Sequence, residues 1–112
     1  MAYNKNLKNK IREQLADHPV IEEKKYVRLE FMVNKKMCVG VIKDEMMCRI
    51  DPEIHKTLVE ITGCRTMDFA KSPMIGYVMI DDSGMRTQKD FEYWIGLALE
   101  YNKKVKSSKK KK

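Results

Sequence analysis

The sequence predicts an α+β fold of two layers, in which helices cover a five-stranded antiparallel sheet. Apolar residues alternate with polar ones in parts of residues 29–50, which is the period of a half-buried strand. Apolar residues also recur at helical spacing near both ends of the chain, and polar turns separate the segments. The predicted order is helix, three strands, helix, two strands and helix, and 112 residues suit one domain.

The first helix is predicted over residues 3–17, where one apolar stripe is formed by Leu7, Ile11 and Leu15. Pro19 ends this helix. The following residues 20–25 include the charged run Glu22-Glu23-Lys24-Lys25. We therefore expect them to form a solvated loop that leads into the first strand.

Three strands are predicted at residues 29–33, 37–42 and 46–50. The first and third alternate between apolar and polar residues, whereas the second is a short apolar run with one glycine, typical of a strand buried on both faces. Polar turns at residues 34–36 and 43–45 connect them. Asp51 and Pro52 then suit the N-cap and the first position of a helix.

The second helix is predicted over residues 52–62, with an inward stripe of Ile54, Leu58 and Ile61. Gly63 is a natural C-terminal cap for it. Two further strands are predicted at residues 65–69 and 77–80, before a turn at residues 81–84.

The last helix is predicted to begin near Thr87, because Thr87-x-x-Asp90 resembles a capping box with Asp in place of Glu. Its broad apolar face predicts that it is the main cover of the sheet. That face consists of Phe91, Trp94, Ile95, Ala98 and Leu99.

The formal charge of +7 is concentrated at the C-terminus. Residues 103–112 hold seven of the 23 basic residues and none of the 16 acidic ones, which leaves residues 1–102 with no net charge. We expect residues 1–102 to form the domain and residues 103–112 to form a lysine-rich disordered tail. The tail is either a solubilising end or a weak, non-specific contact with nucleic acid through Lys103, Lys104, Lys106, Lys109 and Lys110.

Cysteine usage and the N-terminus predict a cytoplasmic protein. The three cysteines are an odd number without CxxC spacing, which favours free thiols over a disulfide framework. The first ten residues contain no apolar segment of a secretory signal, and no apolar run approaches the roughly 20 residues that span a bilayer. We expect no association with a membrane.

No residue pattern in the sequence predicts catalysis, a metal or a cofactor. His18 and His55 lack the spacing of a metal motif and are interpreted as surface residues. Cys38 and Cys48 share a face of the sheet if their connecting loop has three residues and lie on opposite faces if it has two. Cys38, Cys48 and Cys64 are interpreted as buried small apolar residues, because no histidine is placed to activate a thiol. Asp81-Asp82 is interpreted as a turn.

Methionine is unusually frequent, with nine residues. Most lie in or beside the predicted strands, where they fill an irregular core or offer an adaptable surface to a peptide or protein partner. Met32 and Met47 are the candidates for a partner surface, because each falls on the polar side of its strand's alternation. The partner is expected to be another protein, and a homodimer is an open alternative.

Three segments, FMVNKKMCVGVIKDEMMCRIDPE, MDFAKSPMIGYVMID and FEYWIGLALEYNKK, resemble the N-terminal domain of the TfoX/Sxy family. The resemblance covers roughly residues 1–102 and is most specific in the second strand, in Met67-Asp68-Phe69 and around Pro73-Met74. One departure is that the family's Met-Phe-Gly-Gly-like segment before the first strand is replaced here by Lys25-Tyr26-Val27-Arg28.

The resemblance implies an α+β fold like that of type III secretion chaperones. It also implies a link to natural competence, in which family members act as transcriptional co-regulators, and it supplies no catalytic residue. Two-domain members have a separate C-terminal domain, without which we expect the full competence-regulator role not to carry over. The hypothesis is a non-enzymatic regulatory or protein-interaction module, with a nucleic-acid-associated protein as the alternative.

Overall fold

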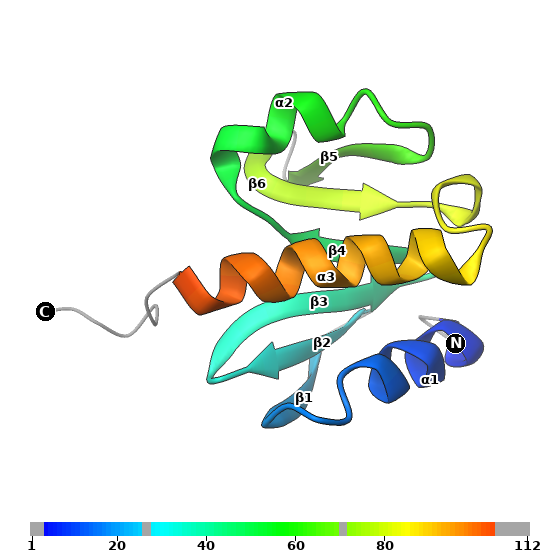
Figure 1. Ribbon diagram of the computed structural model, residues 1–112, viewed down its shortest axis with the longest axis vertical. Coiled ribbons are helices and arrows are strands. Elements are labelled where there is room, and N and C mark those ends of the chain that lie inside the picture. Colours follow the sequence, from blue (N-terminus) through cyan, green and yellow to red (C-terminus); the bar gives the residue numbers. More distant parts are fainter. Residues whose placement is uncertain (1–3, 26–27, 70–71, 105–112) are drawn as a thin grey trace, which may run out of the picture.

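The structure is a computed structural model and describes residues 4–25, 28–69 and 72–104. These residues form a six-stranded antiparallel sheet in the order β1-β2-β3-β4-β6-β5 (Figure 1). The strands are β1 (Val20–Lys25), β2 (Arg28–Val33), β3 (Lys36–Ile42), β4 (Glu45–Arg49), β5 (Cys64–Phe69) and β6 (Ser72–Ile80). The helices are α1 (Lys5–Gln14), α2 (His55–Leu58) and α3 (Gln88–Lys104), with 3₁₀ turns η1 (Pro52–Ile54) and η2 (Asp82–Gly84). The predicted α+β class is confirmed.

The sixth strand is β1, which the sequence analysis interpreted as a solvated loop. It pairs with β2 along its whole length, from Val20 opposite Val33 to Lys25 opposite Arg28. An edge strand pairs on one side only, and charged residues there prevent pairing with other molecules. The run Glu22-Glu23-Lys24-Lys25 is therefore compatible with a strand, although it lacks the apolar alternation that would have predicted one.

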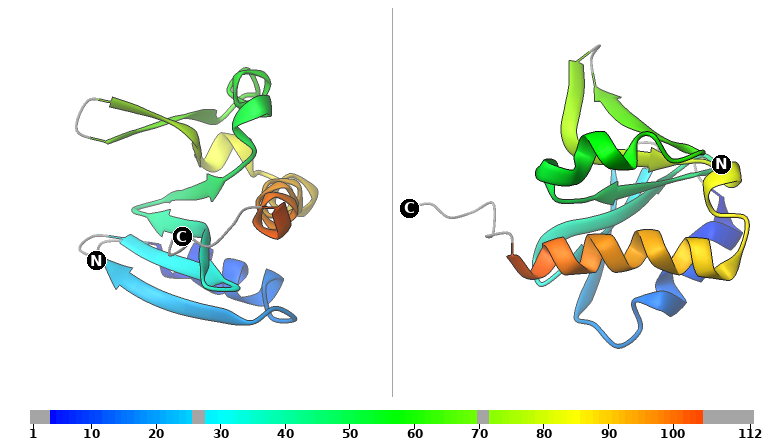
Figure 2. Two further views of the ribbon diagram at one scale, coloured as in Figure 1. Left: turned by 90° about the vertical axis from the view of Figure 1, so that its left-hand side faces the viewer. Right: turned by 45° about the horizontal axis from the view of Figure 1, so that its top comes forward.

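The helices cover one face of the sheet and enclose the main core. Figure 2 shows α2 and α3 on the same side of the sheet, with α3 across its centre. The apolar stripe of α1 and the predicted face of α3 are buried in one cluster with the inward side chains of β2, β3 and β4. The α3 residues fully buried there are Phe91, Trp94, Ile95 and Ala98.

The predicted starts of the second and third helices are confirmed by their caps, whereas the first helix begins at Lys5, two residues later than predicted. The Asp90 amide donates to Thr87 Oγ1 at 3.0 Å, which fixes the start of α3. The Glu53 amide donates to Asp51 Oδ1 at 2.9 Å at the start of η1. Asp81 begins η2 by accepting from the Ser83 amide, as the interpretation of Asp81-Asp82 as a turn requires.

The predicted inward stripe of the second helix is wrong at two of its three positions. Leu58 is buried, whereas Ile54 and Ile61 are 37% and 39% exposed. The segment begins as a 3₁₀ turn and its α-helix ends at Leu58, so the spacing of a continuous α-helix does not apply. His55 takes a buried position instead, with 3% of its surface exposed.

Trp94 connects α3 to the two loops that contain Gly63 and Gly84. Its indole Nε1–H donates to the carbonyl oxygen of Gly84 at 2.9 Å. Gly84 packs directly on Gly63, where a Cβ atom would collide with the Gly84 backbone and φ is +85°. Gly63 also accepts a hydrogen bond from the Asp81 amide at 2.9 Å. The tryptophan thus fastens the main helix to both loops.

Replacing Trp94 by Ala should lower the free energy of unfolding by about 3–5 kcal/mol, because it leaves a large cavity and an unpaired carbonyl. Denaturant unfolding followed by circular dichroism measures this. The control is Tyr93→Ala, which changes the adjacent aromatic residue, 49% exposed, and should have a much smaller effect. Equal unfolding midpoints for the two variants would show that α3 does not hold the core.

Candidate functional site

The face of the sheet opposite the helices carries a second apolar cluster. Met47, Met67 and Met79 are buried there, and Met37, Ile42, Met74 and Tyr77 pack against them half-buried. We call this surface the methionine face. Among the residues that the structure describes, the three helices all lie on the other face of the sheet, so the side chains of the methionine face come from strands alone.

Strand register explains why these side chains meet. Residues that pair directly across neighbouring strands share a face of the sheet. One such row crosses the methionine face and consists of Glu30, Gly40, Met47, Met79 and Arg65. Gly40 leaves space in this row, because a Cβ atom there would lie 2.9 Å from Met47 Cε. Met47 therefore lies across the backbone of β3.

A bend in the β5–β6 hairpin brings two further methionines to this face. The pairing of β5 with β6 shifts between Thr66 and Met67, and Gly76 has φ of +96°. Figure 2 shows the hairpin curving away from the helices. As a result Met67 and Met74, which pair with each other, join the cluster around Met47.

His55 holds this bend from the helical side of the sheet. Its Nδ1 accepts from the Gly76 amide at 3.0 Å, and its Nε2 lies 2.8 Å from Thr66 Oγ1. Since the amide can only donate, Nδ1 is unprotonated and Nε2–H donates to the hydroxyl. The interpretation of His55 as a surface residue is therefore wrong, and its role is structural. His18 is half-buried.

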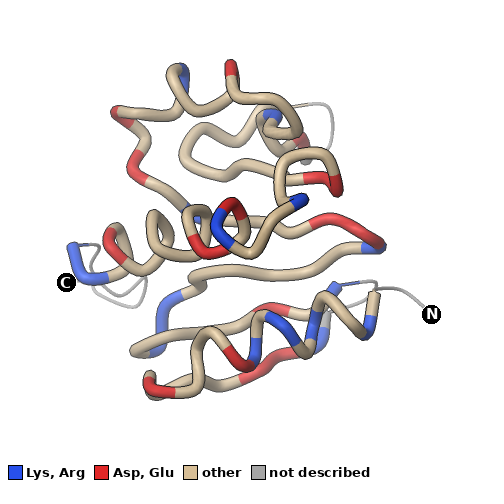
Figure 3. Tube along the Cα trace, turned by 45° about the vertical axis from the view of Figure 1, so that its right-hand side comes forward, with Lys and Arg blue, Asp and Glu red and all other residues tan. Residues whose placement is uncertain are grey.

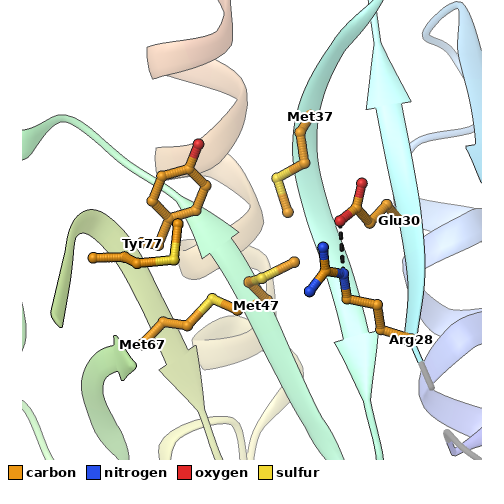
Figure 4. A pocket seen from close by; sticks show the side chains of 7 residues that line it. Arg28, Glu30, Met37, Met47, Met67 and Tyr77 are labelled. Atoms are coloured by element: carbon orange, nitrogen blue, oxygen red, sulfur yellow. Dashed lines mark hydrogen bonds and ion pairs between the residues drawn. The ribbon is translucent and has the colours of Figure 1, made fainter. Parts of the chain in front are cut away.

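The methionine face contains a pocket of about 290 Å³. Figure 4 shows its side chains converging from β2, β3, β4, β5 and β6. The lining residues are Arg28, Glu30, Met37, Met47, Met67, Met74 and Tyr77. The pocket is thus mostly apolar with one polar wall, a composition typical of ligand-binding pockets.

The polar wall is an ion pair within β2. Arg28 Nε donates to Glu30 Oε2 at 2.8 Å, and the two side chains are 28% and 6% exposed. On the opposite wall, the ring of Tyr77 lies 5.7 Å from the Arg49 guanidinium, which also lies 5.8 Å from the ring of Tyr101. This cation–π contact positions Tyr77 at the pocket.

The structure separates the two methionines predicted as a partner surface. Met47 lines the pocket and is 2% exposed, while Met32 is half-buried on β2 outside the lining residues. Their binding of a partner stays a prediction. Arg28, Glu30 and Tyr77 were not predicted from the sequence as site residues. The sequence signal that could have identified Arg28 and Glu30 is their alternation with the inward-facing residues of β2.

The predicted nucleic-acid contacts are only partly described. Lys103 and Lys104 are exposed at the end of α3, which continues two residues past the predicted domain boundary. Lys106, Lys109 and Lys110 lie outside the described residues. Over the described body, basic and acidic segments are interspersed (Figure 3), as in the ion pair of Arg12 with Glu22 between α1 and β1.

The cysteines are free and buried, as predicted. The loop between β3 and β4 has two residues, Lys43 and Asp44, which alone would place Cys38 and Cys48 on opposite faces. The register shift that pairs Phe31 with Val39 but Met32 with Met37 leaves Cys38 as an extra residue. Both thiols consequently lie in the helix-side core.

Burial keeps these thiols protonated. It raises the pKa of Cys38 to about 12 and that of Cys64 to about 11, from an ordinary value of 9.0. Burial, followed by the neighbouring Cys38 and Cys64, raises the pKa of Cys48 well above 9.0. A thiolate nucleophile is therefore disfavoured at neutral pH.

The described residues contain no cluster of three or more His, Cys, Asp or Glu that could hold a metal ion. Within the same ranges, none of the helices is sufficiently long and apolar to cross a membrane.

The family model described as the TfoX N-terminal domain matches residues 13–101. No curated protein and no solved structure matches the chain.

The buried thiols predict a loss of stability at alkaline pH. The unfolded chain releases thiol protons above pH 9.0, whereas the folded chain keeps them, so the free energy of unfolding should fall as pH rises from 9.0 towards the raised pKa values. Urea unfolding across this range measures the decline. Cys38→Ala should make it shallower, and an unchanged slope in this variant would contradict the assignment.

Proposed function

Because the chain belongs to the TfoX N-terminal domain family, we propose that it is a regulatory module that binds another protein through its methionine face. The observation that carries this proposal is the pocket on that face, which five strands build and which methionines line. Its activity is binding rather than catalysis.

The character of the lining supports a protein partner. Methionine is unbranched and flexible, and surfaces rich in it adapt to different apolar side chains. Met37 and Met74 are half-buried at the pocket, so part of their apolar surface is available for contact. The bend held by His55 and Gly76 keeps the hairpin wall in place, which lowers the entropic cost of binding.

The family suggests the cellular role. We propose that partner binding is linked to transcriptional regulation, in the manner implied for competence regulators, and that it takes place in the cytoplasm.

Met74→Asp should abolish capture of the partner, because it places a charge in the lining of an apolar pocket. The measurement is affinity capture from a lysate of the source cells, with nuclease, followed by mass spectrometry. The control is Ile75→Asp, since Ile75 is the next residue of β6, is 57% exposed and does not line the pocket. Capture that Met74→Asp leaves intact, or that nuclease abolishes, would refute the proposal.

A second function, weak binding of nucleic acid, rests on the charge distribution. All of the net charge lies in residues 103–112, and residues 1–102 sum to zero. Long-range attraction to phosphate would therefore come from the tail.

Replacing the lysines of residues 103–112 by Gln should flatten the salt dependence of duplex DNA binding. Each phosphate contact contributes about −0.9 to the slope of log affinity against log salt concentration. Titration of a labelled duplex at two salt concentrations measures this slope. Lys5→Gln with Lys89→Gln, which removes exposed charges from the body, is the control. An unchanged slope in the tail variant would assign binding to the body instead.

A further inference from the structure

We infer that the pocket of the methionine face takes a partner segment in which an acidic side chain lies beside a long apolar one. This inference rests on the proposed function and deepens it by naming the chemistry of the partner. The apolar side chain would lie among the methionines, and the carboxylate would bind Arg28.

The preference for an apolar side chain follows from the residues that form the floor and one wall of the pocket. Met47 lies over Gly40 at the floor, and Met67 and Met74 form the wall that the β5–β6 bend supplies. A pocket of about 290 Å³ is near the lower end of the range for ligand sites, about 300–1,000 Å³. One or two side chains fill such a volume, whereas a large cofactor does not.

The preference for an acidic side chain follows from the unequal exposure of the two partners of the ion pair, Arg28 and Glu30. Arg28 is 28% exposed and Glu30 only 6%, so the cation is the accessible charge on this wall. Glu30 occupies the Nε–H of Arg28, and Figure 4 shows the rest of the guanidinium pointing towards Met47 and Met37. Guanidinium N–H groups can bind a second carboxylate while one edge stays paired.

A basic segment fits this wall poorly. Its cation would have to reach Glu30, which is only 6% exposed and paired with Arg28, and would be repelled by that more exposed guanidinium. Another acidic residue of this face, Glu23, pairs across from Glu30 on β1 and does not line the pocket. Charge complementarity at the pocket therefore selects an acidic partner.

The test is selection of short randomised peptides displayed on phage against the full-length protein. We expect enrichment of Asp or Glu next to Leu, Met or Phe. A synthetic copy of the best peptide should bind about tenfold more tightly than its Asn or Gln counterpart, as expected for a charge-assisted hydrogen bond. Enrichment of Lys or Arg next to the apolar residue would overturn the inference.

Variants of the ion pair test the role of Arg28 without leaving a buried carboxylate unpaired. In Arg28→Gln/Glu30→Gln the tenfold preference for the acidic peptide should disappear, while Arg28→Lys should retain part of it. The control is Arg12→Gln, which removes the arginine of another ion pair, Arg12–Glu22, on the helical side. An acidic preference that survives in the double variant would contradict the inference.

Methionine methyl NMR then locates the bound peptide. Binding should shift the ε-methyl signals of Met37, Met47, Met67 and Met74, and leave those of Met46 and Met85 in the helix-side core unchanged. Peptides that shift the pocket methyls without an acidic preference would overturn this inference alone. If no peptide shifts them, both this inference and the proposed docking site are refuted.

Discussion

A sheet with two apolar faces and helices on only one of them is the constraint on which this structure depends. Within β4, Met46 packs in the helix-side core, and the next residue, Met47, packs on the opposite face. Leaving that second face in water would cost free energy in proportion to its apolar area. The strands themselves reduce this area, because the β5–β6 hairpin bends at Gly76. His55 fixes that bend, so a histidine packed on the helical side determines the shape of a pocket on the other.

The elements whose signals are local could be predicted from the sequence. The stripes of α1 and α3, the alternation of β2 and β4 and the cap at Thr87 each depend on residues close in the chain. The parts that were predicted wrongly, namely β1 and the inward stripe of the second helix, depend on partners far away in the chain. β1 is a strand because β2 offers it an edge to pair with. The second helix has other inward residues than predicted, because it begins as a 3₁₀ turn and His55 packs inward.

The candidate site was predictable only in part, for the same reason. Alternation placed Met47 on the second face, but only the register across five strands shows that it meets Met67, Met74 and the ion pair of Arg28. A single extra residue in β3 moved Cys38 into the same core as Cys48, although the two-residue loop alone implied opposite faces. Bulges and positive φ angles have weak sequence signals, and they decide which side chains converge.

Under the proposed function, the use of methionine rather than Leu or Ile on the second face reconciles stability with binding. A face that binds a partner must remain covered when the partner is absent, since exposed apolar patches promote aggregation. Flexible thioether side chains can meet both demands, because they pack on one another when free and repack around a guest. The close approach of Met47 Cε to the position of a Cβ at Gly40 shows how far they spread across the sheet. Such a lining distinguishes guests poorly by shape, so in the proposed function selectivity falls to the charged wall of Arg28 and Glu30.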